Sequence, residues 1–210
     1  LISSIATDEA VATASINGLQ LLNHTGHPMG KVRSVASVFV SRIDTAADEL
    51  ILAGGNDVKP LAGKIAVANA KMIYQKFLAL FQNPDFLELK KLGAHVQRPL
   101  WGSTGTKNPN YSDVLYVEEL IGPHTVNTAP PATIDAFRDH GSLRFSLQED
   151  IPGAKTALAQ LSQAGIDLTA ITTALQEAGI KAFADSYKNV LRAITQKKER
   201  LLGQHRIHYS

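Results

Sequence analysis

Hydrophobic residues along this chain follow two different spacings, which alternate at regular intervals. Between residues 32 and 40 the sequence VRSVASVFV is almost continuous in β-branched and small apolar residues. Such a run predicts a strand covered on both faces, as in a parallel sheet. Between residues 61 and 82, apolar residues such as Ile65, Met72 and Phe77 recur at helical spacing, which predicts a helix with one buried side. The two patterns together indicate a strand followed by a crossover helix.

The alternation continues toward the C-terminus and predicts an α/β fold, in which helices cover a parallel sheet through right-handed crossovers. After Gly141 no further strand is expected. The other expected strands lie at 98–102 and 124–128, and the other expected helices lie at about 7–22, 112–121, 130–137, 152–164, 168–178 and 180–202, before a loose tail at 203–210.

Composition narrows the class of protein. The 210 residues are 44% hydrophobic, and 21 Lys and Arg against 19 Asp and Glu leave a net charge of +2. So small a charge argues against nucleic acid or an anionic membrane as partner and favours a small ligand. No apolar run approaches the roughly 20 residues required to span a bilayer.

Cysteine is absent, which excludes a disulfide framework and a thiolate metal site and leads us to expect a cytoplasmic protein. The histidines are scattered, and no pair of them shares a helical face with a carboxylate at metal-ligand spacing. We therefore expect no metal site.

Polar residues follow two of the expected strands at the point where each strand ends. Ser41-Arg42 follows the first strand, and the loop from Ser103 to Lys107 follows the second. Because ligands of parallel sheets bind at the carboxyl ends of the strands, we expect Arg42 and Lys107 to face one anion, most simply a phosphate. Arg42 offers a planar fork for phosphate oxygens, Lys107 offers a point charge, and the loop offers hydroxyl and N–H donors.

Other interpretations of these residues stay open on the sequence alone. Arg42 could pair with Asp44 or Asp48 on the surface, and Lys107 could be a solvated loop lysine. A Schiff-base role for Lys107 is disfavoured, because its neighbours are polar and the loop is expected to be wet. The Glu118-Glu119 pair is interpreted as an exposed helix face.

Four segments, in order along the chain, give a more specific indication. They are SVASVFVSRID at 34–44, GKIAVANA at 63–70, LWGSTGTKNP at 100–109 and LIGPHTVNT at 120–128, followed by Asp139-His140-Gly141. Together they resemble the longer bacterial and plant form of transaldolase. The likeness extends over almost the whole chain, although glycine stands at position 102 where the family usually has alanine.

The resemblance implies that residues 1–210 are the C-terminal half of a single (β/α)8 barrel domain, from the end of the fifth strand to the eighth, followed by terminal helices. Such barrels take about 250 residues, so the missing N-terminal half is an expected partner. Residues 142–210 are expected to pack on the barrel as a terminal helical segment. In this comparison residues 1–4 resemble the end of the fifth strand, 32–40 the sixth, 98–103 the seventh and 124–128 the eighth.

Transaldolases transfer a dihydroxyacetone unit between sugar phosphates of the pentose phosphate pathway through a lysine Schiff base, without metal or cofactor. By resemblance, Ser37 faces the dihydroxyacetone unit, Arg42 holds the phosphate, and Ser103 and Lys107 fall where the remaining phosphate ligands lie. The Schiff-base lysine and the acid-base carboxylates belong to strands that have no counterpart here. The resemblance therefore implies no catalytic residue in this chain, which is expected to be inactive alone.

Two further functions stay open. The first is a non-catalytic module that binds phosphate ligands on a small open sheet and is complete in 210 residues. The second is an interaction domain built on the amphipathic segment 180–202. The preferred sugar phosphate and the formation of a homodimer are also left open.

Overall fold

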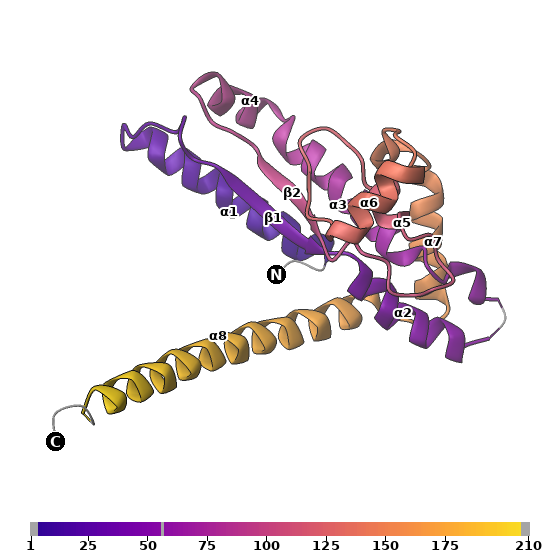
Figure 1. Cartoon of the computed structure of the whole chain (residues 1–210). Helices are drawn as coiled ribbons and strands as arrows, with labels where there is room; N and C mark the ends of the chain where they lie inside the picture. The colour runs from indigo at the N-terminus through magenta and orange to yellow at the C-terminus, as the bar shows by residue number, and fades with distance from the viewer. Residues whose placement is uncertain (1–3, 56, 207–210) are drawn as a thin grey trace. The chain divides into compact units, whose positions relative to one another are not determined.

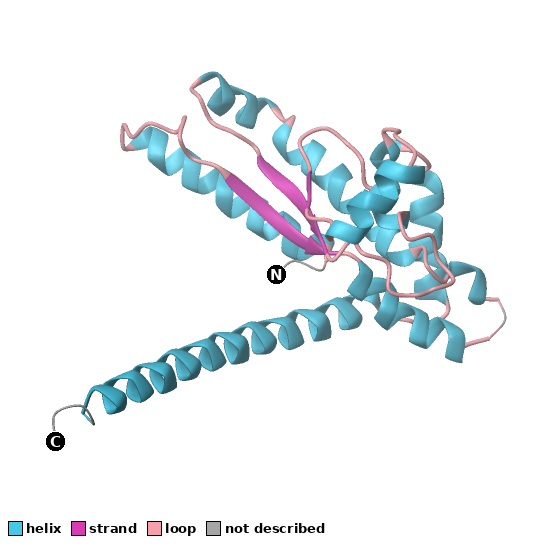
Figure 2. Ribbon diagram, viewed as in Figure 1, coloured by secondary structure: helices cyan, strands magenta, loops and turns pink. Residues whose placement is uncertain are grey.

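The computed structural model describes residues 4–55 and 57–206, and within them it contains one sheet of three parallel strands. Strand β1 (Ser34–Phe39) pairs with β2 (Gln97–Gly102), which pairs with β3 (Val126–Asn127). Figure 2 shows the strands side by side, with helices in the connections between them. This order confirms the expected alternation of strands and helices and the α/β class.

Helices make up most of the rest of the described chain (Figure 1). The strand expected at 98–102 begins one residue earlier, and the strand expected at 124–128 is only two residues long. The helices are α1 (Ile5–His24), α2 (Ser41–Ala53), α3 (Ile65–Phe81), α4 (Pro84–Lys91), α5 (Leu115–Glu119), α6 (Pro131–His140), α7 (Ile151–Gln163) and α8 (Leu168–Arg206), with short 3-10 helices η1 (Lys59–Leu61) and η2 (Ser146–Gln148).

Helix α4 was not predicted from the apolar spacing. It begins after Asn83, whose Oδ1 accepts a hydrogen bond from the Phe86 N–H at 2.8 Å, and Pro84 occupies its first turn. Asparagine satisfies a free N–H at a helix start, and proline is tolerated in the first turn because its missing N–H has no partner there. The local start signal was therefore present in the sequence.

The segment 1–4, which by resemblance ends a fifth strand, lies mostly outside the described residues. Ser4 is described, and its Oγ accepts a hydrogen bond from the Thr7 N–H at 3.2 Å. Ser4 thus caps helix α1 and is not part of a strand.

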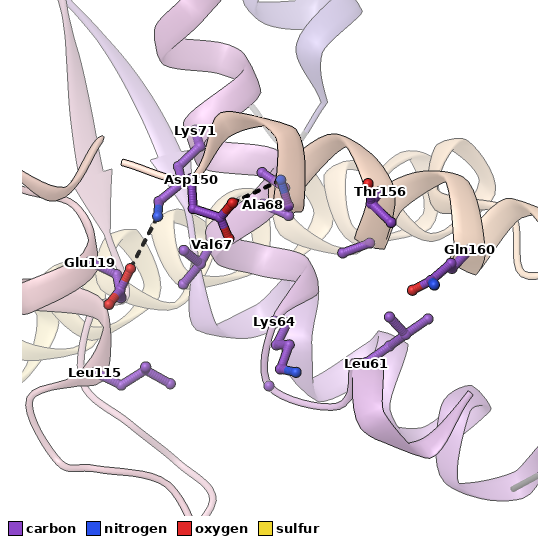
Figure 3. A pocket seen from close by; sticks show the side chains of 14 residues that line it. Leu61, Lys64, Val67, Ala68, Lys71, Leu115, Glu119, Asp150, Thr156 and Gln160 are labelled. Carbon is purple, nitrogen blue, oxygen red and sulfur yellow. Dashed lines mark hydrogen bonds and ion pairs between the residues drawn. The ribbon is translucent and has the colours of Figure 1, made fainter. Parts of the chain in front are cut away.

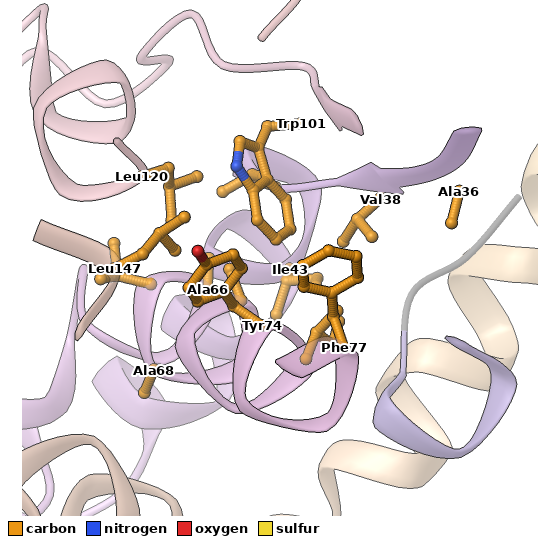
Figure 4. Packing of buried hydrophobic residues seen from close by; sticks show 14 of the residues in the cluster. Ala36, Val38, Ile43, Ala66, Ala68, Tyr74, Phe77, Trp101, Leu120 and Leu147 are labelled. Carbon is orange, nitrogen blue, oxygen red and sulfur yellow. The ribbon is translucent and has the colours of Figure 1, made fainter. Parts of the chain in front are cut away.

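The core lies between one face of the sheet and helices α2 and α3. Val38 and Trp101 from the sheet, Ile43 from α2, and Tyr74 and Phe77 from α3 are all at most 3% exposed. Figure 4 shows these side chains packed together. The rings of Tyr74 and Phe77 stack with centroids 5.6 Å apart, an arrangement that adds to the stabilisation from apolar burial.

The opposite face of the sheet is much less buried, so the expectation that strand 32–40 is covered on both faces is wrong for the described residues. Ala36 and Val38 are 4% and 0% exposed, whereas Val35 is 44% exposed and Ser37 is half-buried. Arg98, which is in register with Val35, is also exposed. Successive side chains of a strand point to opposite faces. An apolar run therefore predicts a strand, but it does not show whether the described chain covers one face of that strand or both.

The helices expected at 168–178 and 180–202 are one helix, α8, so the predicted break at Gly179 is wrong. A glycine inside a helix costs only about 1 kcal/mol relative to alanine, and the flanking sequence LQEAGIKAFA contains no proline. The tail expected from residue 203 is helical as far as Arg206, and residues 207–210 lie outside the described part.

The chain divides into two compact units, Leu1–Leu175 and Gln176–Ser210. In the first unit α7 packs against α3. Considered by itself, the described part of the second unit, residues 176–206, is helical and belongs to α8. The packing of the whole segment 142–210 on a barrel stays a prediction. Within residues 4–55 and 57–206, no helix combines the length and the apolar character needed to cross a bilayer.

Candidate functional site

The carboxyl ends of β1 and β2 stay paired beyond the strands themselves. The Val40 N–H donates to the Gly102 carbonyl at 2.9 Å, and the Ser41 N–H donates to the Ser103 carbonyl at 3.1 Å. The hydroxyl oxygens of Ser41 and Ser103 lie 2.8 Å apart, within hydrogen-bond distance. Helix α2 begins at Ser41, so Arg42 occupies its first turn. The structure thus brings Arg42 and Ser103 to the same end of the sheet.

Arg42 is exposed and lies over an aromatic ring. Its guanidinium carbon is 5.2 Å from the centroid of the Phe39 ring. Arg42 makes no ion pair with Asp44, Asp48 or any other residue in the described part of the chain, so the interpretation of Arg42 as a surface ion pair is wrong. A cation–π contact of this kind uses none of the guanidinium N–H donors, and the planar fork can bind an anion by two parallel hydrogen bonds.

Ser37 lies two residues before Phe39 on β1, and the two side chains share the sheet face that points away from α2 and α3. In the register of the sheet, Ser37 stands opposite Leu100 of β2. Ser37 and the ring beneath Arg42 therefore belong to the same, less buried face.

The loop after β2 is held at two points. The Thr104 hydroxyl donates to Asn127 Oδ1 at 2.7 Å, which ties the loop to β3, and the Thr106 hydroxyl donates to the Ser112 carbonyl at 2.8 Å. Lys107 is exposed, and its ammonium makes no hydrogen bond or ion pair with any residue that the structure describes. Lys107 is a solvated cation on a fixed loop, and its contact with the same ligand as Arg42 stays a prediction.

Two buried aspartates on α2 fix this end of the sheet, and the sequence interpretation missed their role. The first is Asp44, which is 2% exposed. Its Oδ1 accepts the Ala66 N–H at 2.7 Å, and its Oδ2 accepts the Tyr116 hydroxyl at 2.8 Å. Burial raises the pKa of the Asp44 carboxyl to about 6, although both hydrogen bonds act in the opposite direction.

The second is Asp48, one helical turn later. Its Oδ1 accepts the Gly63 N–H at 3.0 Å, and its Oδ2 accepts the Tyr111 hydroxyl at 2.7 Å. Burial and the neighbouring Asp48 raise the pKa of the Tyr111 hydroxyl. Gly63 has a left-handed backbone (φ 73°), and a Cβ at this position would approach the Tyr111 ring to 2.7 Å. The contact therefore requires glycine.

These two aspartates join three parts of the chain. Helix α2 contains Arg42. The N–H donors Gly63 and Ala66 lie just before α3 and in its first turn, and the segment from Tyr111 to Tyr116 follows the loop that contains Lys107. In a sequence, two aspartates four residues apart on a helix are typical of a solvent-exposed helix face. The partner glycine and tyrosines were visible, but their pairing with α2 depends on tertiary structure.

Comparison with known proteins agrees with the family resemblance found in the sequence. The family model described as "Transaldolase/Fructose-6-phosphate aldolase" matches residues 1–194. This chain belongs to that family. It is 44% identical over 195 residues to a protein named transaldolase from Thiobacillus denitrificans, covering 92% of this chain and 54% of the relative. It is 43% identical over 195 residues to a protein of the same name from Mycobacterium tuberculosis, covering 91% and 52%. The chain spans about half the length of the curated relatives it matches.

Membership of the transaldolase family confirms the resemblance seen in the sequence. The motif Asp139-His140-Gly141, which was part of that resemblance, connects α6 with the loop before α5. The His140 Nε2 lies 2.9 Å from Asp113 Oδ1, and its Nδ1 lies 3.2 Å from Asp139 Oδ2. Hydrogen bonds to these two carboxylates raise the pKa of the His140 ring.

A cavity of about 530 Å³ lies between α3, α5 and α7 in this family member (Figure 3). Lys71 is 6% exposed, and its Nζ donates to Glu119 Oε2 at 3.2 Å and to the Glu149 carbonyl at 3.1 Å. Arg144 also pairs with Glu119 and with Glu149. The expectation that Glu118-Glu119 is an exposed face is therefore wrong. Both glutamates are half-buried, Glu118 Oε1 accepts the Ser142 N–H at 2.6 Å, and Glu119 belongs to this charge network.

Metal ligands do not gather anywhere in the described ranges. No group of three or more His, Asp or Glu side chains in residues 4–55 and 57–206 is arranged to hold a metal ion. The polar groups described above at the carboxyl ends of the strands are hydroxyls and the cations Arg42 and Lys107.

Proposed function

We propose that this chain supplies the phosphate-binding part of a transaldolase, an enzyme that transfers a dihydroxyacetone unit between sugar phosphates through a lysine Schiff base. The observation that favours this role is the position of Arg42. Its free guanidinium lies in the first turn of α2, beside the Ser41–Ser103 contact that holds the carboxyl ends of β1 and β2 together. A sugar phosphate bound there places its anionic group against a fixed cation.

Each candidate residue has a separate role in this proposal. Arg42 binds two phosphate oxygens in parallel, because its fork matches their geometry. Ser103 donates a hydroxyl to a third oxygen, and Lys107 adds a charge from the loop. Ser37, on the sheet face below Phe39, faces the sugar and donates to a hydroxyl of the dihydroxyacetone unit.

The less buried sheet face supports the proposal that a further part of a barrel completes the protein. Val35, Ser37 and Arg98 share this face and are exposed or half-buried, whereas the interior of a (β/α)8 barrel is packed with side chains. The curated relatives are about twice as long as this chain. We assign the Schiff-base lysine and the acid-base carboxylates to the remaining half, and the absence of cysteine fits a reducing cytoplasm.

Substitution of Arg42 by alanine tests the phosphate contact. Loss of a charge-assisted bidentate contact costs about 1.5–3 kcal/mol, or roughly a 10- to 100-fold loss of affinity. The loss should apply to fructose 6-phosphate and not to fructose, as measured by calorimetry on the purified protein. Arg192→Ala, an exposed position in the second unit, is the control and should leave both affinities unchanged. Equal losses for the two sugars would refute the phosphate contact.

Borohydride trapping tests the assignment of the Schiff-base lysine to the other half of the protein. With fructose 6-phosphate, these 210 residues alone should form no stable adduct, because the Schiff-base lysine is assigned to the other half. An adduct on Lys107 would overturn this assignment. A stable, monomeric protein of 22.6 kDa that binds sugar phosphates without turnover would instead support the non-catalytic module.

A further inference from the structure

Ser103 has a backbone conformation that serine rarely adopts. Its φ of 56° lies in the left-handed region, which is unfavourable for residues with a side chain because Cβ comes too close to the following carbonyl oxygen. Such a conformation persists where surrounding contacts hold it, and it is concentrated at binding and active sites. The contacts that hold Ser103 therefore bear on what the end of the sheet can bind.

Contacts with the end of β1 hold Ser103 from one side. The Ser41 N–H donates to the Ser103 carbonyl at 3.1 Å, and the hydroxyl oxygens of the two serines lie 2.8 Å apart. Both the backbone and the side chain of Ser103 are thus attached to the start of α2. The next contact along the chain holds the loop from the side of β3.

This second contact is made by Thr104, which is 0% exposed. Its hydroxyl donates to Asn127 Oδ1 at 2.7 Å, and Asn127 is in register with Trp101. Three residues of extended strand cover about 10 Å, so a straight continuation of β2 would carry Thr104 well past Asn127. The left-handed residue at position 103 turns the chain back toward this partner.

The residue after Thr104 lies against the same part of the protein. A Cβ at Gly105 would approach Pro130 Cγ to 3.0 Å and Thr133 Oγ1 to 3.5 Å. Pro130 caps α6 and Thr133 lies in its first turn. The loop therefore follows the end of β3 and the start of α6, and the Thr104 hydroxyl supplies its hydrogen bond to this region.

We propose that Thr104 is a positioning residue for the phosphate site. Its hydrogen bond to Asn127 holds Ser103 in the left-handed conformation, which keeps the Ser103 hydroxyl beside Ser41, where it donates to the phosphate. Thr104 is fully buried and acts without touching the ligand. This inference rests on the proposed function, in which Ser103 is a phosphate ligand. The alternative is that the hydrogen bond only strengthens the pairing of β2 with the two-residue strand β3.

Calorimetry with fructose 6-phosphate and with fructose, on the purified protein, tests this inference. Thr104→Val keeps the branched shape of the side chain and removes the hydroxyl. It should weaken the binding of fructose 6-phosphate about tenfold, as for the loss of one hydrogen bond to a charged group, and leave the binding of fructose unchanged. Thr104→Ser retains the hydroxyl and should bind both sugars within about twofold of wild type.

Thr128→Val is the matched control. The Thr128 hydroxyl donates to the Trp101 carbonyl at 3.1 Å, so this variant also removes a hydroxyl contact between β2 and the end of β3 but leaves the contact of Thr104 in place. It should change the binding of fructose 6-phosphate by less than about twofold. In a Ser103→Ala background, Thr104→Val should likewise add a loss of less than about twofold, because Thr104 acts through the Ser103 hydroxyl.

Four results would overturn the inference: unchanged binding of fructose 6-phosphate in Thr104→Val, an equal loss for fructose, an equal loss in Thr128→Val, or an undiminished loss in the Ser103→Ala background. Should Thr104→Val fail to fold, Asn127→Ala removes the acceptor at an exposed position and should give the same selective loss. The Arg42→Ala measurement separates the two proposals. Equal losses for both sugars in that variant refute the phosphate contact, whereas a selective loss there with none in Thr104→Val refutes only the positioning role.

Discussion

Substitution of Asp44 by asparagine should change the pH dependence of stability in a predictable direction. Burial raises the pKa of this carboxyl from 3.8 to about 6 in the folded protein. Between these values the folded state binds more protons at Asp44 than the unfolded state does. The free energy of unfolding therefore falls as pH rises through this range, and the whole cost of the buried charge is present above about pH 6. Asparagine does not titrate and does not have this cost.

The magnitude follows from the shift. A difference of about two pKa units corresponds to about 3 kcal/mol at 1.36 kcal/mol per unit, and linkage places about 2 kcal/mol of this between pH 4.5 and 7.5. Asp44 is 2% exposed, so solvent screening reduces the value little. Asparagine can still accept the Ala66 N–H, and the Tyr116 hydroxyl can rotate to accept from its amide. Relative to wild type, Asp44→Asn should therefore gain about 2 kcal/mol of stability as pH rises over this interval.

Urea unfolding followed by the fluorescence of Trp101 is a suitable assay, because Trp101 is the one tryptophan of the chain and is fully buried in the same core. Burial also raises the pKa of Asp8 to about 6, but Asp8 is present in both proteins and its contribution cancels in the difference. A difference between the two proteins that stays flat from pH 4.5 to 7.5, or that has the opposite sign, would refute the reasoning.

Two further substitutions test contacts near the site. Gly63→Ala should lower the free energy of unfolding by about 1–2 kcal/mol for the left-handed backbone, plus about 1–3 kcal/mol for overlap with Tyr111. Gly26→Ala, at a similar φ (71° against 73°) with nothing within 4 Å of the added Cβ, should show the first loss alone. Equal losses at the two positions would exclude the overlap. Lys71→Ala should cost about 1.5–3 kcal/mol, because it removes charge-assisted hydrogen bonds to Glu119 and to the Glu149 carbonyl, while Arg144 continues to pair with Glu119. Chemical denaturation measures this, and a loss below about 0.5 kcal/mol would contradict it.

Local spacing was sufficient to predict much of the architecture. The β-branched run at 32–40 and the apolar spacing at 61–82 placed β1 and α3 correctly to within a few residues. Helix α4 was missed although Asn83-Pro84 marks its start, because eight residues show too little periodicity. Gly179 was given too much weight as a helix breaker in α8.

The candidate site was only partly visible in the sequence. Arg42 and Ser103 could be placed together because both follow strand ends of a parallel sheet. Asp44 and Asp48 could not be distinguished from solvated helix residues, since their burial depends on α3 and on the segment containing Tyr111 and Tyr116. The degree to which each sheet face is covered also depends on distant chain segments, and the continuous apolar run did not reveal it.

The contact between the hydroxyls of Ser41 and Ser103 can adapt to what lies beside it. Either oxygen can be the donor, and only one of the two protons can lie between oxygens that are 2.8 Å apart. Ser41 is 1% exposed, whereas Ser103 is half-buried, so Ser103 is the member of the pair that an outside group can reach. When Ser41 donates to Ser103, the Ser103 proton is left to donate, and a donor that itself accepts a hydrogen bond is polarised and donates more strongly. When Ser103 donates to Ser41 instead, its oxygen offers a lone pair. The same pair can therefore answer an anion or a donor by reversing one hydrogen bond.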